Sequence, residues 1–314
     1  SVSVGASVGV IVSNSSTTST IDRDLDAGGE FTLGAAATRS YMTDATASAG
    51  GSQSEDTYSS NKTQADSSRS STTLAKNQDS KTNQGTQSGG KVNVAAAVGV
   101  IVIDDNARAA VTGGRTISSG AGQAMRIGAT NVSNFSVRGA GDAVDPNAKV
   151  GVGVGVGLVI SKDDTSAALA DNTHVTRSGA LTVQAQSEQN TDSSYANKLT
   201  AEGLAGAGGS KVGVAGAFAV VDSHTTTTAG IGSKTKIDQA DALTIDAENT
   251  ATLSAKAWAG AFGKVGVGAS VATVISDNSY SASLGSGSDI TAASVDITAR
   301  NNKFSPSPFS LNLG

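Results

Sequence analysis

The chain has 314 residues, of which 38 are Gly, 4% are aromatic and 16% are charged, a composition unlike that of ordinary globular domains. A net charge of −5 leaves no basic surface for phosphate backbones, and the absence of cysteine excludes disulfides, thiolate metal sites and a cysteine nucleophile. We therefore expect no nucleic-acid partner. Hydrophobic residues still make up 38% of the chain and recur at regular positions, which indicates a folded repeat protein rather than a disordered one.

Five segments of about twenty residues align with one another without gaps. They begin at Ser1, Lys91, Lys149, Lys211 and Lys264, and the last four starts are 58, 62 and 53 residues apart. In every segment the second and fourth residues are Val, and the residues between the bulky ones are mostly Gly, Ala or Ser. This period of two predicts a long β-strand with two unlike faces.

The two faces of this strand carry different expectations. We expect the bulky face to form core, and the Gly and Ala face to admit another backbone layer at close range. The expected inward ladder comprises Val94, Val152, Val214 and Val267.

A second pattern, apolar–any–apolar–any–Ala, follows each long strand. It starts at Phe31, Met125, Leu181, Leu243 and Val295. Further apolar residues lie between the two patterns, at Ile117, Val175, Ile237 and Ile290. We expect each unit to hold one long strand and two or more short ones.

No unit has enough apolar residues for a core of its own, so the units are expected to stack with equivalent strands paired in parallel. The predicted fold is all-β: a parallel β-solenoid, β-helix-like, of five repeats of about 53–62 residues. We favour one wide, flattened coil per repeat, because the long strand has no second copy within its unit. Two ordinary coils per repeat are the alternative.

The expected organisation is one continuous solenoid domain with a polar insertion in its first repeat. The insertion spans 52–89, and we expect it to lie outside the repeat and to tolerate deletion. The repeat boundaries are 1–90, 91–148, 149–210, 211–263 and 264–303, followed by a tail at 304–314. The chain carries no signal-peptide pattern and opens on a strand-like one, so we expect it to be cut from a longer protein.

Three alternating carboxylates, Asp22, Asp24 and Asp26, precede a glycine pair in the first repeat. An EF-hand loop starting at Asp22 would need Gly at its sixth position and Glu at its twelfth, where this chain has Ala27 and Leu33. We therefore expect a solvated turn, and metal binding stays open.

Acidic residues recur after the long-strand patterns, at Asp104 and Asp105, Asp163 and Asp164, and Asp277 with Asn278. Their recurrence in successive repeats indicates shared turn architecture rather than a single catalytic centre.

The remaining candidates are two histidines and one tryptophan. His174 and His224 occupy nonequivalent positions and are expected at the surface. Trp258, close to Phe262, is expected to be a core or inter-layer plug rather than a sugar platform. We predict no catalytic residue, no cofactor and no enzyme activity.

The repeats resemble those of giant bacterial leukotoxin-type filamentous adhesins. The resemblance is carried by the Val-Gly run from Lys264 to Ala272, the polar turn after it, and the strands at 290–292 and 295–299, and it covers nearly the whole chain. It implies an extracellular or bacterial cell-surface location and a non-catalytic stalk or filament segment that presents other modules or self-associates. The implied partners are neighbouring repeats of a longer parent chain, other copies of the chain, and host or cell-surface ligands, without membrane insertion.

Two other functions are compatible with parts of the sequence. A β-helical carbohydrate-binding or carbohydrate-active module is the leading alternative, although 4% aromatics argues against a sugar groove. Ice binding is suggested by the run from Thr225 to Thr228, but only alternate Thr residues share a face and the array does not persist through the other repeats.

Overall fold

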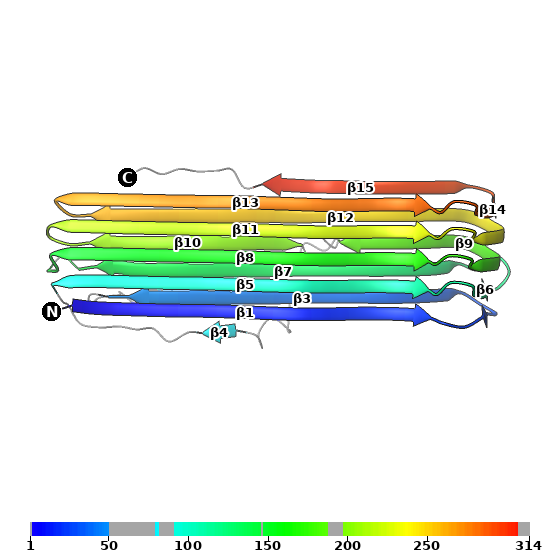
Figure 1. The fold of residues 1–314 in the computed structure, drawn as a ribbon, viewed down its shortest axis with the longest axis horizontal. Coiled ribbons are helices and arrows are strands. Elements are labelled where there is room, and N and C mark those ends of the chain that lie inside the picture. Colours follow the sequence, from blue (N-terminus) through cyan, green and yellow to red (C-terminus); the bar gives the residue numbers. More distant parts are fainter. Residues whose placement is uncertain (1, 50–78, 82–90, 146, 188–196, 307–314) are drawn as a thin grey trace.

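The computed structural model describes residues 2–49, 79–81, 91–145, 147–187 and 197–306, and every regular element within them is a β-strand. The strands pair in parallel within two sheets (Figure 1). The predicted all-β parallel β-solenoid is therefore confirmed.

Sheet A consists of the five long strands, one from each repeat, in the order β1-β5-β8-β11-β13. They are β1 (Val2–Ile21), β5 (Val92–Val111), β8 (Val150–Leu169), β11 (Val212–Ile231) and β13 (Val265–Leu284), each of 20 residues. At about 3.3 Å per residue, each spans about 66 Å. Val94 pairs directly with Val152, the equivalent residue of the next repeat, so each repeat is one flattened coil.

Sheet B has ten strands, which return across the other side of each coil. They are β2 (Leu25–Asp26), β3 (Phe31–Ser48), β4 (Asp79–Lys81), β6 (Thr116–Ser118), β7 (Met125–Val144), β9 (His174–Ser187), β10 (Lys198–Gly208), β12 (Lys236–Phe262), β14 (Asp289–Ala292) and β15 (Val295–Pro306). The expectation that the second sequence pattern forms a short strand is wrong. The pattern lies at the start of a longer strand or within one: β3 has 18 residues, β7 has 20 and β12 has 27. The alternation of inward and outward side chains continues through Ala, Ser and Thr, so apolar residues alone do not mark the full length of these strands.

The turn from sheet A to sheet B repeats in four coils. The third residue after each long strand has a positive φ, between 55° and 72°, at Gly114, Asn172, Lys234 and Gly287. Backbone hydrogen bonds join these turns from coil to coil: the amide of Asn172 donates to the carbonyl of Ser233 at 2.9 Å. Glycine and asparagine adopt this conformation readily, so three of the four turns carry a suited residue, and Lys234 is the exception.

The interior is divided into layers along the strands. Next to the turns lies an apolar core that includes Ile127, Leu181 and Ile245, and a second apolar cluster contains Phe135 and Val159. At the opposite end of the coils the apolar residues of the interior are all small, in two clusters made of Ala. The coil is therefore thick at its turn end and thin where the long strands begin.

The predicted insertion and tail fall mainly outside the described residues. Of the insertion, only 79–81 is described, and there β4 pairs in parallel with Met42 to Asp44 of β3. Of the tail, Phe304 to Pro306 belong to β15 and pair with β12.

Candidate interaction surface

The outward face of sheet A is divided sharply along the strands. Over the first eleven residues of each long strand, the outward side chains are apolar or glycine in all but two places, Thr273 and Asp222. Beyond this stretch they are polar or charged except at Ala110, Ala168 and Gly230, near the strand ends. We call the outward residues of the first part the apolar face: 2, 4, 6, 8, 10 and 12 of β1, 92–102 (even) of β5, 150–160 (even) of β8, 212–220 (even) of β11 and 265–275 (odd) of β13.

The predicted ladder of Val94, Val152, Val214 and Val267 exists, with each residue beside its equivalent in the neighbouring strand. The prediction that it points inward is wrong, because these side chains lie on the apolar face. At the outer strand of the sheet Val12 is 73% exposed, and even in the interior of the sheet Val214 is 39% exposed.

The reason is the distance between the two sheets at this end of the coil. A Cβ added to Gly155 of β8 would lie 2.6 Å from the carbonyl oxygen of Gly139 and 2.6 Å from the carbonyl carbon of Leu204, both backbone atoms of sheet B. The close backbone approach predicted for the glycine face is therefore present. It leaves no room for a second row of bulky side chains inside, so the Val residues occupy the outer face.

A buried polar layer separates the two apolar clusters of the interior. Its centre is Arg39 of β3, a residue that the sequence search did not single out. The Arg39 Nε lies 3.1 Å from Asp105 Oδ1 of β5 but donates its hydrogen bond to Ser15 Oγ at 3.0 Å. Both Asp105 oxygens are thus buried beside a charge and without a hydrogen-bond donor among the described residues. The alternation of inward and outward residues along β3 places Arg39 inside, because it continues the inward series of Leu33, Ala35 and Ala37.

Burial dominates the electrostatics of this layer. It raises the pKa of Asp105 to about 7, although Arg39 opposes the shift, and the neighbouring Asp163 adds to it. Burial also raises the pKa of Asp163 to about 6, against the hydrogen bonds that it accepts from Ser161 at 3.0 Å and Ser133 at 3.1 Å.

The predicted acidic turns are not turns. Asp105 and Asp163 lie inward in the middle of long strands, whereas Asp104 and Asp164 face outward on the polar part of sheet A. Lys162 bridges the outward pair, with its Nζ 3.4 Å from Asp104 and 3.1 Å from Asp164. Asp disfavours strands in isolation, which favours a turn here. In the sheet, however, Asp104 lies directly across the ladder from Lys162, an opposite charge.

The three carboxylates of the first repeat bind the second coil. Asp24 accepts the backbone amide of Thr116 at 2.8 Å, Asp22 lies 3.3 Å from Arg115, and Asp26 accepts a hydrogen bond from Ser118. No group of three or more His, Asp or Glu side chains in the described ranges is placed to hold a metal ion.

Both histidines are partly exposed, as predicted, and each has carboxylate neighbours in space. His174 Nε2 lies 2.7 Å from Asp238 Oδ2, and His224 lies 3.1 Å from Asp222 and 3.8 Å from Asp277. Hydrogen bonds from Lys236 and then His174 lower the pKa of Asp238.

The expected placement of Trp258 is wrong. Its side chain is 46% exposed on the outer face of sheet B, beside Leu204 of β10 and over Gly260, with Phe262 further along the same face. The inward positions of this strand are Ala257 and Ala259, because the thin end of the coil accommodates only small residues.

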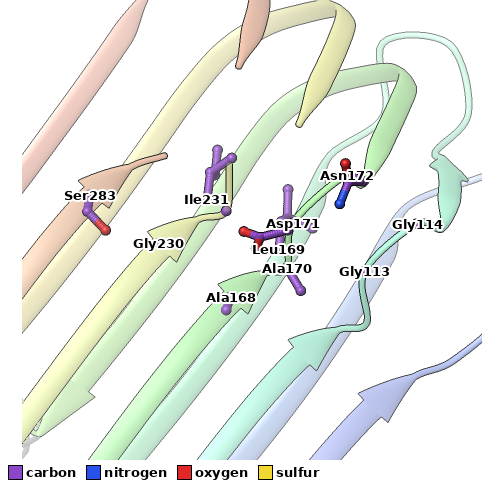
Figure 2. A pocket seen from close by; sticks show the side chains of 11 residues that line it. Gly113, Gly114, Ala168, Leu169, Ala170, Asp171, Asn172, Gly230, Ile231 and Ser283 are labelled. Atoms are coloured by element: carbon purple, nitrogen blue, oxygen red, sulfur yellow. The ribbon is translucent and has the colours of Figure 1, made fainter. Parts of the chain in front are cut away.

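An open depression of ≈ 760 Å³ lies along the turns of successive coils (Figure 2). Its polar groups are engaged between coils: the backbone carbonyl of Asp171 accepts the amide of Gly114 at 3.0 Å, and its carboxylate accepts the amide of Ser233 at 2.7 Å. Figure 2 shows Leu169 and Ile231 at the strand ends of neighbouring coils beside it. We therefore interpret this depression as the uneven surface left between the stacked turns.

Two further results concern the chain as a whole. Nowhere in the described part is there a helix long and apolar enough to cross a membrane. Comparison of the chain with protein-family models, with curated proteins and with solved structures gives no match.

Proposed function

We propose that this chain is a structural stalk or filament segment of a bacterial cell-surface or secreted adhesin, non-catalytic, which holds other modules away from their anchor. The observation that supports the proposal best is the unbroken register of sheet A. All 20 residues of each long strand pair with their equivalents in the adjacent coil, across five coils.

This register suits a mechanical role. In a parallel sheet the interstrand hydrogen bonds are evenly spaced and slanted, but they join neighbouring strands and so hold adjacent coils together along the stacking axis. A force along that axis acts on the hydrogen bonds of both sheets between two adjacent coils at the same time, rather than on one bond after another. Each coil contacts only its neighbours, so such a segment can be lengthened by repetition without redesign of its core.

The two edge strands of sheet A support the proposal that the segment pairs with further repeats or further copies of the chain. β1 and β13 each have one neighbour in that sheet, and an unpaired strand edge accepts a further strand. Further repeats of a parent chain or other copies of this chain would supply one.

The placement of the acidic residues favours a structural role over hydrolysis. Asp105 is 0% exposed and Asp163 is 4% exposed, within an interior that a polysaccharide does not enter. Asp104 and Asp164 share Lys162 in an ion-pair row between coils.

The proposal is tested in the organism that makes the protein. An antibody against this segment should label intact cells, and external protease should remove the signal. In-frame deletion of whole coils should leave export intact but bring the distal modules closer to the cell, as measured by immunoelectron microscopy. Labelling only after lysis would refute the proposal, and so would polysaccharide hydrolysis abolished by Asp163→Asn with Asp164→Asn.

The exposed position of Trp258 favours a second candidate, a carbohydrate-binding module. Trp258 and Phe262 present aromatic side chains on one flat face, and indole rings stack on sugars. Glycan-array binding by the wild-type protein, lost in Trp258→Ala but retained in Tyr280→Ala, would establish it. Equal signals for all three proteins would rule it out.

A further inference from the structure

We propose that the apolar face of sheet A is a pairing surface for a second copy of this chain, with the two faces packed together around a two-fold axis parallel to the stacking axis of the coils. This inference rests on the proposed structural role and names the partner and the surface. It is carried by the size, the chemistry and the relief of the face.

The size of the face matches that of a stable dimer interface. Five strands about 4.8 Å apart, each contributing about eleven residues at about 3.3 Å, give a flat area of about 900 Å² per copy. Two copies would bury about 1,800 Å², within the range of specific interfaces, which bury about 1,200–2,000 Å² in total.

The chemistry of the face suits burial. Its outward residues are Val, Ile, Leu, Phe, Ala and Gly apart from Thr273, and the one charged residue in the same stretch of the five strands, Asp222, lies at its edge. Exposed apolar patches beyond about 300–600 Å² are rare on monomeric proteins. An apolar surface of this extent therefore requires a partner of the same character.

The relief of the face is complementary to itself. One row across the sheet consists of small residues except at Val154, and it is flanked by two rows of Val; the small ones are Ala6, Ala96, Gly216 and Ala269. In β11 the neighbouring row carries Phe218, which is 43% exposed, while a Cβ at Gly216 would have nothing within 4 Å. A two-fold axis between these two rows places Phe218 of each copy over Gly216 of the other.

This axis also keeps the charged half of sheet A in water. A rotation about the stacking axis reverses the strand direction, so the apolar faces overlap and the polar halves extend on opposite sides. A two-fold axis along the central strand β8 would instead keep the strand direction, so that Lys162 would face Lys162 and Asp164 would face Asp164. Like charges directly opposite are unfavourable, which selects the first arrangement.

The mass of the protein in solution tests the pairing. We expect twice the chain mass by analytical ultracentrifugation, and at least a tenfold weaker dimer for Phe218→Lys. The matched control is Thr226→Lys, on the same outward face of the same strand but in the polar half, which should pair as the wild type does. Gly216→Val is a second variant without added charge, and it should weaken pairing by filling the space that Phe218 needs.

Spin labels test the axis, and the absence of natural cysteine makes them specific. Ser166→Cys lies in the polar half of the central strand, about eleven residues from the axis, so the two labels should be about 70 Å apart. A separation of about 10 Å, the spacing of packed sheets, would refute the proposed axis.

Other outcomes would refute the pairing itself. These are a monomeric wild type at about 100 μM, far above the Kd expected for an interface of this size, an assembly unaffected by Phe218→Lys, or a monomer that binds phosphatidylcholine vesicles through this face. Surface labelling of cells distinguishes the two proposals, because its failure would refute the adhesin stalk and leave the dimer standing.

Discussion

Glycine on the inner side of sheet A is required by the close approach of two backbones, and Gly155→Ala tests this requirement. The new Cβ would lie 2.6 Å from backbone atoms of Gly139 and of Leu204, whereas real Cβ atoms essentially never approach other atoms within 3.0 Å. Neither obstacle is a side chain that can rotate away. The sheets must therefore separate locally, with loss of the van der Waals contacts around the substituted residue.

The expected cost is at the upper end of overpacking effects. Added methyl groups in a close-packed interior cost about 1–3 kcal/mol, and with backbone on both sides we expect about 3 kcal/mol. At about 2.1 cal/mol/K of unfolding entropy per residue, 1 kcal/mol in a chain of 314 residues corresponds to about 1.5 °C in Tm, so Tm should fall by about 4–5 °C.

Gly216→Ala is the matched control. Gly216 faces outward in β11, where an added Cβ meets nothing within 4 Å. Because Ala restricts the unfolded chain more than Gly, this variant should be unchanged or more stable by about 0.4–1 kcal/mol. Thermal unfolding followed by far-UV circular dichroism at low protein concentration measures both variants. Equal Tm values for the two would show that the sheets are not in contact at Gly155.

Three other predictions concern the buried acid, the core and the surface ion pairs. Burial raises the pKa of Asp105 from 3.8 to about 7, so its protonated form is favoured in the native state and stability should fall as the pH rises from about 4 to about 7. Asp105→Asn should flatten that slope in urea unfolding, and a wild-type stability that rises over this interval would contradict the assignment. At low protein concentration, where pairing does not contribute, Ile245→Ala at a side chain that is 0% exposed should cost about 2–5 kcal/mol, whereas Ile275→Ala at 49% exposure should cost less than about 1 kcal/mol; similar losses would place both residues in the same environment. Lys236→Met should raise the pKa of Asp238 toward its ordinary value in an NMR titration with Tm unchanged, and an unshifted titration would exclude the pair.

The acidic residues show where the sequence was insufficient. Sequence propensity predicts turns at Asp105 and Asp163, because Asp disfavours strands in isolation. In the fold, Arg39 of sheet B lies across from Asp105, and Ser133 of sheet B and Ser161 of the same strand donate to Asp163. Arg39 and Ser133 are far from these acids in sequence, so no local pattern pairs them with Asp105 and Asp163.

The sequence by itself determined the repeat, the strand character of its long segments and their parallel stacking. A unit that recurs every 53–62 residues and cannot bury its apolar residues alone has stacking as its solution, and equivalent residues then align, as Val94 does with Val152. Only the tertiary structure decided which face of each strand is inside. A period of two is unchanged when a strand is turned over, so the alternation of Val and Gly is compatible with either orientation. The choice depends on the opposite sheet, which brings Gly139 and Leu204 against Gly155, closer than any side chain allows, and so directs the valines outward.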